Sequence, residues 1–175
     1  TKQNEIAAKV GKQSKDITAY LKALSDLEII EKLLPFEEKN VKKTTYEVSD
    51  QMYRFWFRFM PRCMSLIGMD MGDTAWKNVI LPELDAYFGH IFETISMQYV
   101  MNQVRTGKIS PAYLAYGKWW GTDPKTRTAE EIDLAASTHD DLLVGECKWQ
   151  KAKVGCDVLD QLQKRGELIS RGRNI

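Results

Sequence analysis

The chain has 175 residues, of which 43% are hydrophobic and 28% charged, and its formal net charge is +1 at pH 7. These values are ordinary for a globular protein of one medium or two small domains. The small net charge argues against non-specific binding of nucleic acid over the whole surface, but it allows local basic patches. Its 3 cysteines lack zinc-ligand spacing, and there is no long apolar run or leader pattern, so we expect a reduced, cytoplasmic protein that makes no membrane contact.

The first fifty residues carry the pattern of two helices followed by a β-hairpin. Apolar residues recur at helical spacing in residues 3–10 and again after Ser14, a residue type that often caps helices. Residues 28–36 and 43–48 are typical of two strands joined by a charged tip. Together these elements resemble a partial winged helix-turn-helix over residues 1–49, whose first helix we expect to lie outside the given residues.

The second predicted helix carries candidate DNA contacts. Lys15, Thr18 and Lys22 fall outside its apolar stripe, and short polar or basic side chains on an exposed helix suit a DNA groove. Winged helices also serve as protein-docking modules, and Asp16 and Asp26 offset the lysines. Binding of DNA and docking of a protein therefore both stay open for this module.

Helical patterns dominate the middle of the chain. Residues 50–60 predict an amphipathic helix that ends at Pro61, and its aromatic stripe favours packing over base stacking. The pattern then weakens, so we interpret residues 50–82 as a helical connector. Pro82 begins a long amphipathic stretch to about Val104, and Glu93 lies within it.

Two strands joined by a tight turn are predicted between residues 130 and 149. The second begins with apolar residues but carries Glu146 and Lys148 where a core strand has no charges. If the turn is centred on residues 139–140, Asp133 lies opposite Glu146 on the same face of the sheet. Two like charges in that position are destabilising unless a cation lies between them.

A hard divalent cation fits this pair of carboxylates. Mg²⁺ or Mn²⁺ takes carboxylate oxygens and keeps several waters, so Asp133 and Glu146 are candidate metal ligands. Lys148 would orient a water molecule or neutralise charge on a phosphate, and the nearby loop 122–129 offers Lys125 and Arg127 as phosphate contacts. The alternative, a solvated Glu-x-Lys salt bridge, remains open on these residues alone.

The order of these parts resembles the PD-(D/E)xK nuclease superfamily. A helix carrying Glu93 precedes a strand with Asp133 and a strand with Glu146 and Lys148, and Ile132 replaces the proline of the motif. The resemblance implies that the four charged residues are catalytic. It also implies a restriction-endonuclease-like α/β domain over residues 83–175, with a central mixed sheet whose last strand we expect outside the given residues.

A narrower resemblance covers nearly the whole chain. The succession of Asp-Gln-Met-Tyr-Arg-Phe-Trp-Phe-Arg-Phe, Tyr-Phe-Gly-His-Ile-Phe-Glu, Trp-Trp-Gly, Glu-Ile-Asp and Gly-Glu-Cys-Lys-Trp is similar to that of archaeal and bacterial AAA-type ATPases. In that family the carboxy-terminal region ends in a domain of unknown function with a restriction-endonuclease-like fold. The resemblance implies an amino-terminal ATPase domain as partner, and ATP belongs to that domain because these residues contain no P-loop pattern.

Two functions of different class follow from the sequence. The first is a Mg²⁺-dependent DNA nuclease or nuclease-like DNA-processing domain of an AAA-type ATPase. The alternative is a non-catalytic DNA-binding or regulatory protein-interaction module of that ATPase, in which the acidic cluster is a structural ion network. The sequence leaves the substrate and the oligomeric state open.

Overall fold

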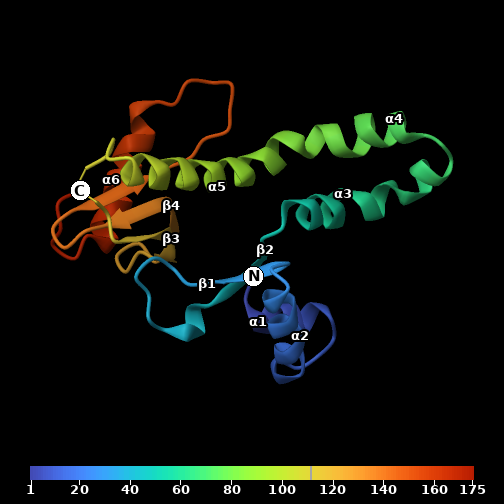
Figure 1. Ribbon diagram of the computed structural model, residues 1–175, viewed down its shortest axis with the longest axis horizontal. Helices are drawn as coiled ribbons and strands as arrows, with labels where there is room; N and C mark the ends of the chain where they lie inside the picture. Colours follow the sequence, from blue (N-terminus) through green and yellow to red (C-terminus); the bar gives the residue numbers. More distant parts are fainter. Residues whose placement is uncertain (111) are drawn as a thin grey trace. The chain divides into compact units, whose positions relative to one another are not determined.

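The computed structural model describes residues 1–110 and 112–175, which fall into two compact units (Figure 1). Unit 1 consists of Thr1–Leu34 and Glu38–Glu83, and unit 2 consists of Pro35–Glu37 and Leu84–Ile175. Each unit combines helices with a small antiparallel sheet. The fold class is therefore mixed α+β.

Unit 1 begins with two helices and a hairpin. In chain order these elements are α1 (Gln3–Lys9), α2 (Ser14–Asp26), β1 (Ile30–Leu33), the 3-10 turn η1 (Val41–Lys43) and β2 (Thr45–Val48). The strands pair antiparallel, with Ile30 opposite Val48. Ala7, Ile17 and Leu21 form a small core against Ile30 and Tyr46. The apolar positions of both helices thus close over one face of the hairpin.

The rest of unit 1 is more helical than the sequence pattern predicts. Helix α3 (Gln51–Gly68) begins where the Asp50 side chain accepts a hydrogen bond from the Tyr53 backbone, at 2.9 Å. The predicted stop at Pro61 is wrong, because the helix continues through this residue. Proline removes one backbone donor, but the buried side chains of Phe59 and Cys63 anchor the helix on both sides of it.

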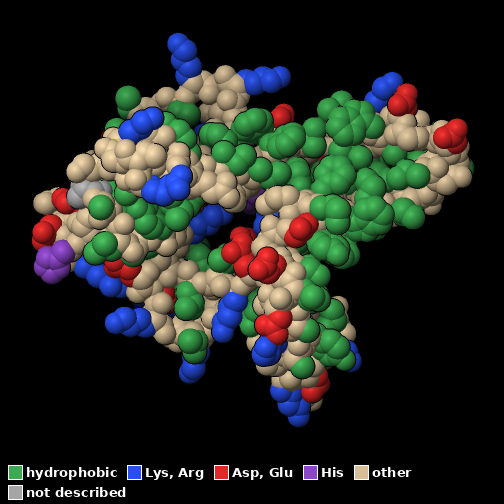
Figure 2. Space-filling view, viewed as in Figure 1, with side chains coloured by type: hydrophobic (Ala, Val, Ile, Leu, Met, Phe, Trp, Pro, Cys, Tyr) green, Lys and Arg blue, Asp and Glu red, His purple; other side chains and the backbone are tan. Residues whose placement is uncertain are grey.

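The predicted connector after Pro61 is also helical. It contains the end of α3, then α4 (Gly72–Ala75), a π-helical turn η2 (Trp76–Ile80) and a 3-10 turn η3 (Leu81–Glu83). Two arginines of α3 form ion pairs with Glu83. Arg62 Nη1 lies 2.6 Å from Glu83 Oε1, and Arg58 Nη2 lies 3.2 Å from Glu83 Oε2. Figure 2 shows hydrophobic side chains gathered over the helices of this part of the chain. The exposed large hydrophobic residues of α3 include Met52, Trp56, Phe57 and Met64.

Unit 2 consists of a long helix, a three-stranded sheet and a second helix, in chain order. Its elements are α5 (Leu84–Arg105), β3 (Ala115–Thr122), β4 (Ala129–Ser137), β5 (Leu142–Gly145) and α6 (Cys156–Ile169). The strands are antiparallel in the order β3-β4-β5, and a single parallel bridge joins Asp141 to Asn174. A four-residue loop connects β4 to β5, because Ser137 pairs with Leu142. The predicted strand up to Trp149 is too long, since β5 ends at Gly145.

The core of unit 2 lies between the sheet and α6. It contains the buried residues Phe36, Ile132, Ala135, Leu142, Leu162 and Ile169. Helix α6 comes close to the sheet at Gly166, where an added Cβ would lie 3.4 Å from Val144 and 3.3 Å from Ile175. This close approach sets α6 over β5, and it therefore fixes which α6 side chains face the end of that strand.

A partly buried ion pair joins Glu37 to the carboxy-terminal segment of unit 2. The Glu37 carboxylate accepts hydrogen bonds from Arg173 Nη1 at 2.7 Å, Arg173 Nη2 at 2.9 Å and Ser137 Oγ at 2.6 Å. The Arg173 side chain is only 9% exposed. Its guanidinium lowers the pKa of Glu37 below the usual value of 4.5. The bidentate geometry fixes the carboxylate in place.

Substituting Glu37 by glutamine should destabilise the chain, because it leaves the buried Arg173 without its counter-charge. We expect Glu37→Gln to lower the free energy of unfolding by about 2 kcal/mol at pH 7, measured by urea unfolding. Since the folded-state pKa of Glu37 is lowered, the difference is present above pH 4.5 and shrinks as the pH falls through the folded-state pKa. The exposed Glu167→Gln should stay within about 0.5 kcal/mol of the wild type.

Candidate active site

Asp133 and Glu146 lie at the end of the β4–β5 ladder. Leu134 pairs with Gly145, so the next position outward sets Asp133 opposite Glu146, the first residue after β5. The Cys147 backbone N–H donates to Asp133 Oδ2 at 2.7 Å. A side-chain carboxylate thus replaces the backbone acceptor that would extend the ladder, and it keeps the segment after β5 next to β4.

Glu93 is positioned by α5 and contacts the first strand of the sheet. Its Oε2 accepts a hydrogen bond from Lys118 Nζ of β3 at 2.7 Å, and its Oε1 lies 3.5 Å from His90 Nδ1 one helical turn earlier. The Glu93 side chain is mostly buried. Lys118 is not among the site residues predicted from the sequence, although a lysine beside Trp119 and Trp120 in a strand indicates a charged partner.

Glu146 is held by two cations, one at each of its carboxylate oxygens. Lys148 Nζ contacts Oε1, and Arg165 Nη1 of α6 lies 3.2 Å from Oε2. Arg165 Nε also lies 2.8 Å from Glu130 Oε2 on β4. The Glu146 side chain is only 9% exposed, so water screens its contact with the part-buried Arg165 only weakly, whereas Lys148 is 38% exposed and its contact is screened more.

Arg165 is also absent from the residues predicted from the sequence, but its position along α6 indicates a charged partner. Arg165 follows Leu162 by three residues and precedes Ile169 by four, which places a charged side chain on the buried stripe of α6. A long cationic side chain at such a position indicates an acidic partner on the facing element. Here the partners are Glu130 and Glu146.

The electrostatics of the cluster act mainly on Asp133, first through its burial and then through its acidic neighbours. Burial raises the pKa of Asp133 above its usual value of 3.8, and the nearby carboxylates of Glu146 and Glu93 raise that pKa further, while the Cys147 N–H opposes the change. The neighbouring Glu146 in turn raises the pKa of Lys148, which therefore stays protonated. A positive charge next to Asp133 would relieve the repulsion.

The donor set suits a hard divalent cation only in part. Among residues 1–110 and 112–175, no group of 3 or more His, Cys, Asp or Glu side chains is arranged to hold a metal ion. Asp133 and Glu146 supply the carboxylate oxygens that Mg²⁺ prefers. Both oxygens of Glu146 contact cationic side chains, so a metal ion at this carboxylate would have to displace Lys148 or Arg165 from one of them.

The predicted DNA contacts of unit 1 are exposed, but two of them already have partners. Lys22 Nζ lies 2.6 Å from Asp26 Oδ2, one turn along α2. The Thr18 hydroxyl accepts a hydrogen bond from the Gln3 amide at 2.9 Å. Lys15 forms no ion pair within the described part of the chain. The face is therefore less basic than the bare sequence indicates.

The predicted DNA contacts of unit 2 lie in the loop between β3 and β4. Lys125 and Arg127 are both exposed, and Arg127 adopts a left-handed backbone conformation with φ of 60°. The same loop and α6 enclose a pocket of about 310 Å³, with Thr126, Thr128, Glu130, Lys164 and Arg165 among its lining residues. The loop is thus close to the Arg165 that holds Glu146.

These features define a mixed α+β protein with a half-buried carboxylate and cation cluster at one end of an antiparallel sheet. The chain belongs to the DUF234 family, described as archaeal and bacterial proteins of unknown function, whose family model matches residues 56–161, more than half of the 175 residues. The matched range includes Glu93, Asp133, Glu146 and Lys148.

A relative extends beyond the chain. An uncharacterised protein of Methanocaldococcus jannaschii is 30% identical over 152 residues, which cover 85% of this chain but 33% of the relative. The chain therefore spans about a third of that protein's length. No solved structure matches the chain. Within the described residues, none of the helices has the length and apolar character needed to cross a membrane.

Replacing Asp133 by asparagine should stabilise the fold at neutral pH. The change removes a like charge beside Glu146 and Glu93 but keeps an acceptor for the Cys147 N–H. Relief of such repulsion is worth up to about 1 kcal/mol, and it should raise the melting temperature by about 1–4 °C in calorimetry without divalent cations.

The pH dependence of this gain follows from the raised pKa of Asp133. The folded state binds the proton more tightly than the unfolded chain, so wild-type stability falls as the pH rises above 3.8 through the folded-state pKa. The gain of Asp133→Asn should accordingly be largest at pH 7 and vanish below pH 3.8. The exposed loop variant Asp140→Asn is the matched control, and an equal gain there would contradict this explanation.

Proposed function

We propose that unit 2 is a Mg²⁺-dependent DNA nuclease domain of the PD-(D/E)xK, restriction-endonuclease-like type. The observation that carries the proposal is the meeting of Asp133, Glu146 and Lys148 at one end of the β4–β5 ladder, in a setting that raises the pKa of Asp133. A half-buried carboxylate near other carboxylates is costly for a purely structural element. Such perturbed groups are more common at functional sites.

In this proposal each residue of the site has a different role. Asp133 and Glu146 would hold the metal ion, which supplies an activated water and a positive charge for the scissile phosphate. Lys148 stays protonated beside Glu146, so its ammonium can donate a hydrogen bond to a phosphate oxygen or to the attacking water. Glu93 of α5 is held by the hydrogen bond from Lys118, and its negative charge contributes to the raised pKa of Asp133.

The larger protein supplies the context of this activity. We propose that the chain is the carboxy-terminal region of an AAA-type ATPase, which agrees with its matching only 33% of the length of its archaeal relative. The two helices and hairpin of unit 1 would then act as a winged helix, with Lys15 on its DNA-facing side. ATP would bind to the other domain of that protein.

Cleavage of labelled DNA tests the nuclease. The purified chain should cut single-stranded or duplex DNA with Mg²⁺ or Mn²⁺ and should stop in excess EDTA. Asp133→Asn and Lys148→Ala should each lower the rate at least about 100-fold, because each removes stabilisation made only in the transition state. The exposed residues Asp140 and Lys108 provide the matched controls Asp140→Asn and Lys108→Ala, which should retain wild-type rates.

A regulatory module is the second candidate, and the ion pairs of Glu146 favour it specifically. Lys148 and Arg165 already neutralise this carboxylate, as in a structural network. In that case no divalent cation supports cleavage, and 10 mM Mg²⁺ leaves the melting temperature unchanged, since a ligand that binds the folded state must stabilise it. The two results together would exclude the nuclease.

A further inference from the structure

Trp149 is a half-exposed aromatic side chain that follows Lys148 in the chain and packs on α5. Its ring centroid lies 5.7 Å from that of Phe88 and 5.6 Å from that of Phe92, and its Nε1 lies 3.4 Å from Asp85 Oδ1. All three partners belong to α5. The Trp149 side chain is nevertheless 49% exposed, so the contacts fix the ring without covering it.

Both the Trp149 ring and its partner Phe92 are next in sequence to a residue of the candidate active site. Phe92 immediately precedes Glu93, and Trp149 immediately follows Lys148. Helix α5 is continuous through its aromatic residues, so it holds the ring at a fixed place relative to Glu93. Phe88 is also 37% exposed, which shows that the aromatic group is not sealed as a core would be.

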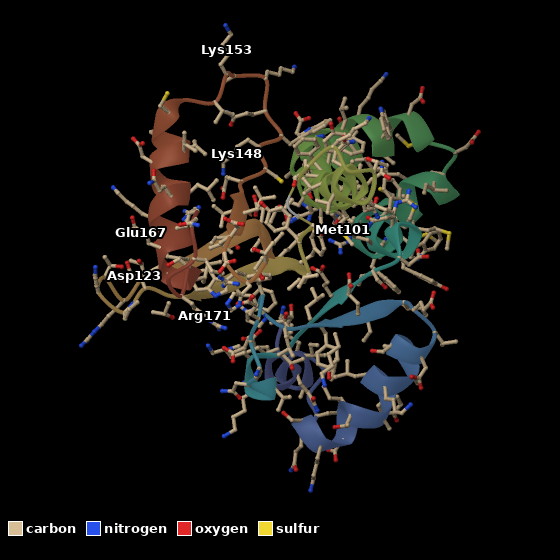
Figure 3. The ribbon with its side chains drawn as sticks, turned by 60° about the vertical axis from the view of Figure 1, so that its left-hand side comes forward. Met101, Asp123, Lys148, Lys153, Glu167 and Arg171 are labelled. Carbon is tan, nitrogen blue, oxygen red and sulfur yellow. The ribbon has the colours of Figure 1, made fainter. Side chains whose placement is uncertain are left out.

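The segment around Trp149 is strongly basic. Residues 148–153 contain Lys148, Lys151 and Lys153 and no acidic residue. Lys151 and Lys153 are exposed and form no ion pair within the described residues, in contrast to Lys148. Figure 3 shows Lys153 pointing outward from the tip of the loop before α6, while Lys148 lies closer to the sheet.

We propose that residues 148–153 form a binding subsite for single-stranded DNA, in which an unpaired base stacks on Trp149 and the lysines contact the flanking phosphates. Aromatic side chains interleaved with cations are the usual means of binding single strands, because every base offers a face for stacking. Paired bases inside a duplex cannot reach the ring. The subsite therefore selects single-stranded segments or frayed ends, and it deepens the proposed nuclease by naming the form of its substrate.

Fluorescence anisotropy of labelled oligonucleotides in EDTA tests this subsite without requiring cleavage. Trp149→Ala should weaken binding of a single-stranded oligonucleotide about tenfold or more, and Trp149→Phe should weaken it less, because a smaller ring keeps part of the stacking. Binding of a blunt duplex of the same sequence should change less than about twofold. Lys151→Gln and Lys153→Gln should each reduce the slope of log affinity against log salt by about 0.7 for the single strand.

Trp56 provides the matched control, since its side chain is 50% exposed but belongs to α3 of unit 1. Trp56→Ala should bind single strands like the wild type. The proposal is overturned if folded Trp149→Ala or Trp149→Phe binds the single strand with wild-type affinity, or if Trp149→Ala weakens duplex binding equally. Cleavage measured separately with Mg²⁺ distinguishes the two proposals, because a chain that binds single strands through Trp149 but never cuts contradicts only the nuclease.

Discussion

The balance of charge at the end of the β4–β5 ladder is the constraint on which unit 2 depends. The carboxylates of Glu93, Asp133 and Glu146 meet there, and burial together with the charges of Glu146 and Glu93 raises the cost of ionising Asp133. They are offset by Lys118, Lys148 and Arg165, which come from β3, the segment after β5, and α6. Removing a cation from such a half-buried set leaves its carboxylate partner with less compensation, whereas removing the charge of Asp133 relieves repulsion. The cluster therefore ties five parts of the chain into one arrangement.

The same balance makes the cluster suited to exchange of partners. An ion pair with little access to water contributes a small net stabilisation, because the free energy lost in desolvating the charges offsets much of their attraction. Glu146 is shared between Lys148 and Arg165, so loss of one contact still leaves it paired. Asp133 accepts a backbone hydrogen bond but no cation at hydrogen-bond distance within the described residues. It is thus the group with the most to gain from a bound cation.

Local patterns in the sequence predict much of this structure, and distant contacts account for the errors. Strand alternation and the tight turn are local, so they predict the β4–β5 hairpin and its register. The end of β5 at Gly145 depends on Asp133, whose carboxylate takes the Cys147 N–H. Likewise α3 continues through Pro61 because buried Phe59 and Cys63 hold it in place. Arg165 and Lys118 were missed because their partners are far away in sequence.

Side chains of the segment after β5 contact two different helices, α6 and α5. Val144 packs near Gly166 of α6, and Glu146 contacts Arg165 of the same helix. Cys147 lies near Ser96, and Trp149 packs on Phe92, both of α5. One short segment thus sends its charged side chain toward α6 and its aromatic one toward α5. Because neighbouring residues of an extended chain point in opposite directions, a single run after β5 suffices to set a charged site next to an aromatic surface.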